Sequence, residues 1–105
     1  MNLKKINRAL ISVSDKSELT KILKVLKKFK VEILSSGGTY KKINRLGYKS
    51  IEISDFTNSP EILDGRVKTL HPKLYGGILF KRNNKKHQKQ IKKINIKKID
   101  LVIVN

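Results

Sequence analysis

Four short and nearly continuous apolar runs, separated by segments with helical periodicity, constrain the fold more than any other feature of this chain. The runs are "RALISVS" at 8–14, "VEILSS" at 31–36, "KSIEIS" at 49–54 and "IDLVIV" at 99–104. Strands that are covered on both faces have this continuous apolar character, which is typical of parallel sheets. The alternation therefore predicts an α/β domain, with a parallel sheet in the middle layer and helices on both of its faces.

The segments between the runs carry the expected helices. Apolar residues recur at helical spacing over 16–29 among lysines, which predicts an amphipathic helix there. Ser14 or Asp15 is its expected N-cap, with Glu18 at capping-box distance from Asp15. A shorter helix is expected to end before Gly47, and Ile91 and Ile94 indicate a lysine-rich helix near the end of the chain.

Size and composition exclude several classes of protein. The 105 residues suffice for one domain, and the absence of cysteine excludes disulfides and thiolate metal sites. No apolar stretch approaches the length of a membrane span, and the first residues lack the apolar run of a secretory signal. We therefore expect a cytoplasmic protein that contacts no membrane and holds no metal.

The formal net charge of +17 raises the alternative of a nucleic-acid-binding module. The run 81–98, "KRNNKKHQKQIKKINIKK", is the best candidate for such a patch. The basic residues are spread along the whole chain, however, and the aromatic residues do not alternate with lysine as in a base-stacking surface. We predict a solvated lysine surface and no nucleic-acid partner, with the basic module as the minority interpretation.

Hydroxyl and glycine residues follow the expected strands. The strand ends are Ser12–Lys16, Ser35–Thr39, Ser54–Thr57 and Asn105. Ligands of parallel sheets bind beyond the carboxyl ends of the strands, and free N–H groups at helix N-termini favour anions there. These ends predict a phosphate site. For "SSGGT" alone, a tight turn with Thr39 as helix N-cap is the simpler interpretation.

The stretch "DGRVKTLHPKLYGGIL" at 64–79 is poorly suited to regular structure because it combines glycines and a proline. It brings Arg66, Lys68, Thr69 and His71 close together in sequence. Its glycines would let the backbone approach a ligand closely. The alternative is a basic surface loop without a function.

Several motifs together resemble a known family. "SVSDK", "ILSSGGT", "SDFTNSPEILDGRVKTLHP", "GGIL" and "IDLVIVN" are similar, in this order and spacing, to the IMP cyclohydrolase domain of the bifunctional purine-biosynthesis enzyme. The partner domain in that family is the AICAR transformylase. The resemblance runs from Arg8 to Asn105, and Tyr75 stands where the family often has histidine.

The resemblance implies a methylglyoxal-synthase-like fold and closure of formyl-AICAR to IMP with loss of water. It also implies a small-molecule substrate, no cofactor, and a homodimer for the full-length enzyme. Lys68 is the implied catalytic residue. The implied substrate-binding residues are Ser12, Ser14, Asp15, Lys16, Ser36, Gly37, Gly38, Thr39, Arg66, Lys68, Thr69 and Asn105.

The end of the sequence also carries an expectation. Asn105 follows the most apolar run with no later helix to cover it. We expect residues 1–105 to form a partial cyclohydrolase domain without the transformylase, with further proton-handling residues beyond Asn105 and little activity alone. A phosphate-effector sensing domain of the same fold is the main alternative function.

Overall fold

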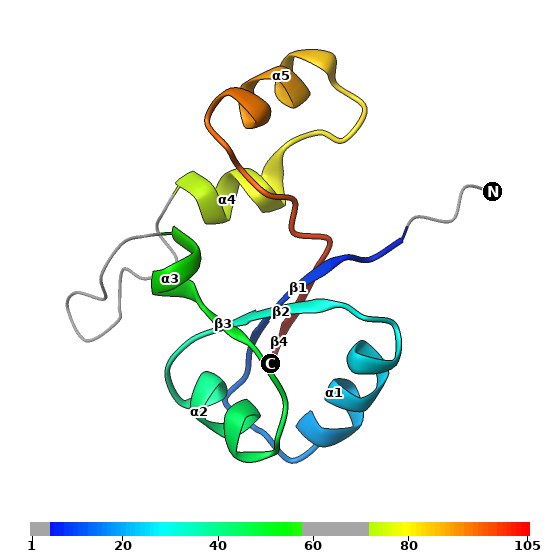
Figure 1. The fold of residues 1–105 in the computed structure, drawn as a ribbon, viewed down its shortest axis with the longest axis vertical. Helices are drawn as coiled ribbons and strands as arrows, with labels where there is room; N and C mark the ends of the chain where they lie inside the picture. Colours follow the sequence, from blue (N-terminus) through cyan, green and yellow to red (C-terminus); the bar gives the residue numbers. More distant parts are fainter. Residues whose placement is uncertain (1–4, 58–71) are drawn as a thin grey trace.

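A four-stranded parallel sheet organises the chain, as the sequence predicts (Figure 1). The computed structural model describes residues 5–57 and 72–105. The strands are β1 (Arg8–Ser12), β2 (Glu32–Ser35), β3 (Ile51–Glu52) and β4 (Leu101–Val104). Their order in the sheet is β3-β2-β1-β4, and every neighbouring pair is parallel. All four apolar runs therefore contribute a strand, although each strand is shorter than its run.

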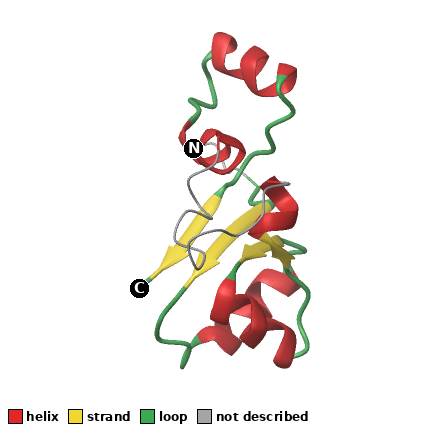
Figure 2. Cartoon of the chain, turned by 90° about the vertical axis from the view of Figure 1, so that its left-hand side faces the viewer, coloured by secondary structure: helices red, strands yellow, loops and turns green. Residues whose placement is uncertain are grey.

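Helices cover both faces of the sheet, which confirms the three-layer prediction (Figure 2). On one face, α1 (Leu19–Lys28) and α2 (Gly37–Arg45) pack on Ala9 and Ile11 of β1. On the other, α3 (Ile53–Thr57) and α4 (Pro72–Leu79) pack on Leu10 and Leu34. Alternate residues of β1 thus enter opposite cores, because successive side chains of a strand point to opposite faces.

The first helix starts later than the sequence predicts. The α1 helix begins at Leu19, its N-cap is Glu18, and no side chain caps it. Asp15 Oδ1 instead accepts a hydrogen bond from the backbone N–H of Ser17 at 3.0 Å, which holds residues 15–17 in a turn. The capping-box prediction is therefore wrong, because the carboxylate of Asp15 is used two residues before the helix starts.

The second helix ends as predicted at a glycine. Gly47 has a φ of 87°, in the left-handed region that glycine adopts without strain. The N–H groups of Gly47 and Tyr48 donate to the carbonyls of Asn44 and Ile43 at 3.0 and 3.2 Å. These bonds satisfy carbonyls that the helix end would leave without partners.

The stretch 64–79 is more regular than predicted, because residues 72–79 form α4. A Cβ on Gly76 would lie 2.7 Å from Cδ1 of Ile96, and one on Gly77 would overlap the carbonyl oxygen of Lys97. The N–H of Ile99 donates to the carbonyl of Gly77 at 3.0 Å. These two glycines therefore allow close packing against the segment before β4, which the sequence did not predict. That the glycines of this stretch let the backbone approach a ligand stays a prediction.

The lysine-rich helix is present as α5 (Lys85–Lys93), with Ile91 as its buried residue. Asn84 caps it by accepting a hydrogen bond from the N–H of His87 at 3.1 Å. Arg82 joins the connection between α4 and α5 to the segment before β4, since its guanidinium donates to the carbonyls of Phe80, Gly77 and Ile99 at 2.9, 3.1 and 2.6 Å. Arg82 thus holds the long segment between β3 and β4 together, because it bonds both to α4 and to the residue before β4.

Candidate functional site

The segments that follow β1, β2 and β4 converge at one end of the sheet. They are the loop 13–17, the first turn of α2 at 36–39, and Asn105. Three sets of contacts join them, and each involves a residue that the sequence singles out. Strand ends of a parallel sheet meet at one edge, so residues far apart in sequence become neighbours here.

Asn105 fastens the end of β4 to the loop after β1. Its Oδ1 accepts hydrogen bonds from the N–H groups of Ser14 and Asp15 at 2.8 and 3.4 Å. Its Nδ2 donates to the carbonyl oxygen of Asp15 at 2.8 Å. The side-chain amide thus bonds to the backbone of residues 14 and 15 both as donor and as acceptor. These contacts fix the conformation of the loop that carries Lys16.

Thr39 fastens the same loop to α2. Its hydroxyl donates to the carbonyl of Val13 at 3.1 Å and accepts from the N–H of Val13 at 3.2 Å. Thr39 is buried. Its hydroxyl therefore bonds to both backbone groups of Val13 in the buried interior, which fixes the distance between the two segments.

Lys16 lies beside the N-terminus of α2. Its Nζ donates to the carbonyls of Val13 and Ser14 at 2.9 and 3.3 Å, and it would lie 3.7 Å from a Cβ placed on Gly38. Ser36 is the N-cap of α2, and its side chain makes no capping hydrogen bond. The first N–H groups of a helix have no intrahelical acceptors and carry a partial positive charge. A lysine ammonium next to that charge creates a position where an anion is favourable.

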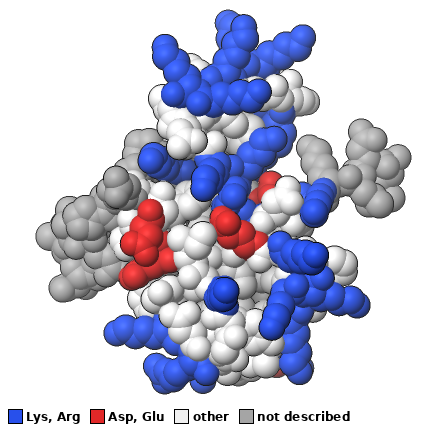
Figure 3. Space-filling model, viewed as in Figure 1, with Lys and Arg blue, Asp and Glu red and all other residues white. Residues whose placement is uncertain are grey.

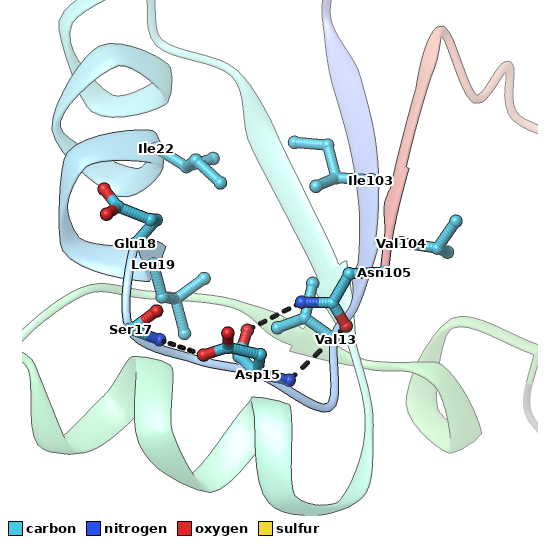
Figure 4. Close-up of a pocket in the computed structure, with 9 residues that line it drawn as sticks. All are labelled: Val13, Asp15, Ser17, Glu18, Leu19, Ile22, Ile103, Val104 and Asn105. Atoms are coloured by element: carbon cyan, nitrogen blue, oxygen red, sulfur yellow. Dashed lines mark hydrogen bonds between the residues drawn. The ribbon is translucent and has the colours of Figure 1, made fainter.

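The carboxylate of Asp15 points toward the backbone of Ser17 in this loop (Figure 4). Hydrogen bonds from Ser17, above all from its backbone N–H, and the nearby charge of Lys16 hold the pKa of Asp15 below its ordinary value of 3.8. Asp15 and Asn105 line a cavity of about 150 Å³ between α1 and β4. Small-molecule pockets usually measure about 300–1,000 Å³, so this cavity is too small for a nucleotide. The carboxylate on its rim also disfavours a phosphate.

The model of the MGS-like domain family matches residues 18–105. The chain belongs to the family of MGS-like domains. Its relatives include the "Bifunctional purine biosynthesis protein PurH" of Acetivibrio thermocellus, Ruminiclostridium cellulolyticum and Clostridium acetobutylicum, at 53, 52 and 55% identity over 100 residues. These findings confirm the resemblance seen in the sequence.

The match covers 95% of this MGS-like domain and 20% of each relative, so the chain spans about a fifth of their length. Among solved structures, the crystal structure of ForH has a TM-score of 0.85 and 31% sequence identity. That match covers 95% of this chain and 52% of the ForH chain. The methylglyoxal-synthase-like fold is thereby confirmed.

The fold brings most of the predicted site residues of this MGS-like domain together. Ser14, Asp15, Lys16, Ser36, Gly37, Gly38, Thr39 and Asn105 lie in the three converging segments. Ser12 is exposed and lies within β1, where it pairs with Val104. Arg66, Lys68, Thr69 and His71 lie outside the described residues.

Two expectations about this edge are corrected. The third strand end, Ser54–Thr57, is helical because β3 stops at Glu52, and the hydroxyl of Thr57 donates to the carbonyl of Ile53 at 3.0 Å within α3. Lys16 precedes α1 and is not part of its first turn. Arg82 is not singled out in the sequence, although it follows the apolar run 78–80 by two positions.

Basic side chains are spread over the face seen in Figure 3 and are dense over α5. No helix within residues 5–57 and 72–105 has the length and apolar character that a membrane span requires. Within the same residues, no group of three His, Cys, Asp or Glu side chains is placed to hold a metal ion.

Proposed function

We propose that this chain is the IMP cyclohydrolase part of a purine-biosynthesis enzyme and binds a purine-type ribonucleotide. The printed name of the relatives, a bifunctional purine biosynthesis protein, supports the pathway. The reaction proposed is closure of formyl-AICAR to IMP. Because the chain spans a fifth of those relatives, the transformylase, a homodimer and a cytoplasmic location are proposals for the longer protein.

One observation carries this proposal: the ammonium of Lys16 lies next to the uncapped N-terminus of α2. Two of its three protons are donated to backbone carbonyls, which leaves one for a ligand. A phosphate there would receive a charge-assisted hydrogen bond from Lys16, backbone N–H groups of Gly37 and Gly38, and the hydroxyl of Ser36. This arrangement suits the 5′-phosphate of a nucleotide.

The reaction itself needs orientation more than covalent help. The carboxamide nitrogen attacks the formyl carbon and a C–N bond forms. The former formyl C–O bond then breaks, and its oxygen leaves as water with one proton from the carboxamide nitrogen and one from the formamide nitrogen, as the ring C=N bond forms. Such a step gains from a folded-back substrate and from donors at the developing oxyanion. By resemblance, Lys68 is the proposed donor there, with Arg66 and Thr69 as further substrate contacts. General acid–base catalysis, worth about 10²–10⁴-fold, is proposed to come from residues beyond Asn105.

Binding of inosine monophosphate tests the proposal, with the free nucleoside inosine as the reference ligand. Calorimetry should show a clear preference for the monophosphate, because a hydrogen bond to a charged group is worth about 1.5–3 kcal/mol. Lys16→Met should reduce this preference by about tenfold or more. Lys24→Met, on the exposed face of α1, is the matched control and should change nothing. Equal affinity for nucleotide and nucleoside would refute the phosphate site.

A further inference from the structure

A second cavity lies at the amino end of the sheet, opposite to the edge that carries Lys16. It measures about 650 Å³, within the usual range of about 300–1,000 Å³ for small-molecule pockets. Three segments meet there, namely the residues before β1, those after α4 and those before β4. Its polar lining residues are Lys5, Asn7, Arg82, Asn83, Lys98 and Asp100. The five residues of β1 separate the two ends of the sheet by about 16 Å, so this cavity is distinct from the proposed phosphate site.

Cations outnumber carboxylates in this cavity. Three of the described lining residues are cations, and Asp100 is the carboxylate among them. Asp100 is already engaged, since its Oδ2 accepts hydrogen bonds from the N–H groups of Asn7 and Arg8 at 2.9 and 3.1 Å. The ion pairs within residues 5–57 and 72–105 involve other cations, Arg8 and Lys21. The three cations of the cavity therefore have no carboxylate partner in the described part of the chain.

Arg82 is the most firmly held of these cations. Its guanidinium donates to the carbonyls of Phe80, Gly77 and Ile99, and its Cζ lies 3.9 Å from the centre of the Phe80 ring. These partners are neutral, so the partly buried positive charge has no counter-charge. A cation that is partly removed from water favours an anion nearby. Because the guanidinium is already ordered, an anion that binds there costs little side-chain entropy.

We propose that this cavity binds a phosphomonoester of metabolite size, as a second ligand of the chain. Three cations and one carboxylate give the lining a formal net charge of +2. A phosphomonoester carries a charge of about −1.5 to −2 at pH 7, so one ligand balances the lining. Lys5 and Lys98 are the proposed donors to the phosphate oxygens, beside the charge of Arg82. Asn7 and Asn83 each offer donors and an acceptor to the polar remainder of the ligand.

A ligand in this cavity would connect segments that are far apart in the sequence. Lys5 and Asn7 precede β1, Asn83 lies between α4 and α5, and Lys98 precedes β4. A ligand that binds only the folded state stabilises that state. Binding is therefore expected to strengthen the attachment of the segment between β3 and β4 to the start of the sheet.

An NMR titration of the 105-residue chain with glucose 6-phosphate tests the proposal, with glucose as the uncharged reference. The backbone amides of Asn7, Asn83 and Asp100 should shift and saturate with the phosphate ester at millimolar concentration, and glucose should leave them unchanged. Succinate has the same charge divided between two separate carboxylates and should bind more weakly. Equal shifts with glucose would overturn the proposal, and so would succinate binding as tight as that of the ester.

Variants separate this cavity from general attraction by the basic chain. Lys98→Met should weaken the binding of glucose 6-phosphate about tenfold, as the loss of one hydrogen bond between charged groups predicts. Lys97→Met removes the same charge at an exposed neighbouring position outside the cavity and is the matched control. Equal weakening in these two variants would overturn the proposal. Lys16→Met should leave the shifts of the cavity amides unchanged, whereas the amides of Gly37 and Gly38 report separately on the proposed phosphate site.

Discussion

The side-chain amide of Asn105 makes two hydrogen bonds with the backbone of Asp15. Its Nδ2 donates to the carbonyl of Asp15 at 2.8 Å, and its Oδ1 accepts from the N–H of Asp15 at 3.4 Å. This pairing joins residues 90 positions apart in the sequence. The position of the loop at 13–17, and with it that of Lys16, therefore depends on the end of β4.

Replacement of Asn105 by alanine should destabilise the fold and weaken nucleotide binding together. The loss of these hydrogen bonds, at about 0.5–1.5 kcal/mol each and partly exposed, predicts a decrease in Tm of several degrees, since 1 kcal/mol corresponds to about 4–8 °C in a domain of this size. Thermal unfolding with and without inosine monophosphate measures both effects. Asn44→Ala, at an exposed position of α2, is the control. An unchanged Tm in Asn105→Ala would show that the contact is not formed in solution.

Thr39→Val should be more harmful than its small change in shape suggests. Valine cannot accept the hydrogen bond from the N–H of Val13, and a buried backbone group without a partner costs about 1–3 kcal/mol. The carbonyl of Val13 also loses the Thr39 hydroxyl but keeps the hydrogen bond from Lys16 Nζ. Chemical denaturation should show a lower midpoint with an unchanged m-value. Thr39→Ser retains the hydroxyl and should keep most of the stability. If both variants lose the same amount, the methyl group and not the hydroxyl is the important part of Thr39.

Gly77→Ala should destabilise the protein although alanine is the better helix former by about 1 kcal/mol. A Cβ at Gly77 would overlap the carbonyl oxygen of Lys97, which is backbone and cannot move freely. Overpacking of this kind costs about 1–3 kcal/mol. Gly76→Ala meets the tip of the Ile96 side chain at 2.7 Å and should be better tolerated, because that side chain can rotate away. The two free energies of unfolding would contradict this account if their order were reversed.

Arg82→Lys should weaken the attachment of the segment between β3 and β4 to the residues before β4, without changing the net charge. Lysine lacks the planar fork that lets Arg82 reach the carbonyls of Gly77 and Ile99 at once. We expect faster hydrogen exchange at Ile99, whose N–H donates to the carbonyl of Gly77. Exchange in α1 should stay the same, and it serves as the internal reference. Equal exchange at Ile99 in both proteins would refute this role of Arg82.

Acid should remove a small stabilising contribution from Asp15. The pKa of this carboxyl is lower in the folded chain than its ordinary value of 3.8, so the folded state holds the proton less tightly than the unfolded state. The contribution is therefore present above pH 3.8 and is lost as the pH falls through the lowered pKa. Asp15→Asn keeps the acceptor for Ser17 and lacks the titration. The stability difference between the two proteins should shrink in acid, and a difference that grew instead would contradict this sign.

The sequence by itself determined the sheet and the residues near its carboxyl edge. The four apolar runs predict four parallel strands because only two-sided burial requires such continuous hydrophobicity. The glycine at 47 marks a helix end because its backbone must enter a region that other residues avoid. Both signals are local, so they can be recognised without knowledge of the fold. The five motifs together, with "DGRVKTLHP" and "GGIL" among them, were sufficient to identify the family.

Only the tertiary structure decided how these pieces are used. Asp15 could have capped α1, but its carboxylate bonds to Ser17. Glycines such as Gly76 and Gly77 are typical of loops, yet both lie in the helix α4. The segment 96–99 packs closely against them there. The hydroxyl of Thr39 forms hydrogen bonds with the backbone of Val13, which is 26 positions away. The turn at Ser17 competes with the helix α1 for the carboxylate of Asp15, and the partners of Gly77 and Thr39 lie far away in the sequence. Such contacts depend on packing geometry, which no local pattern of residues contains.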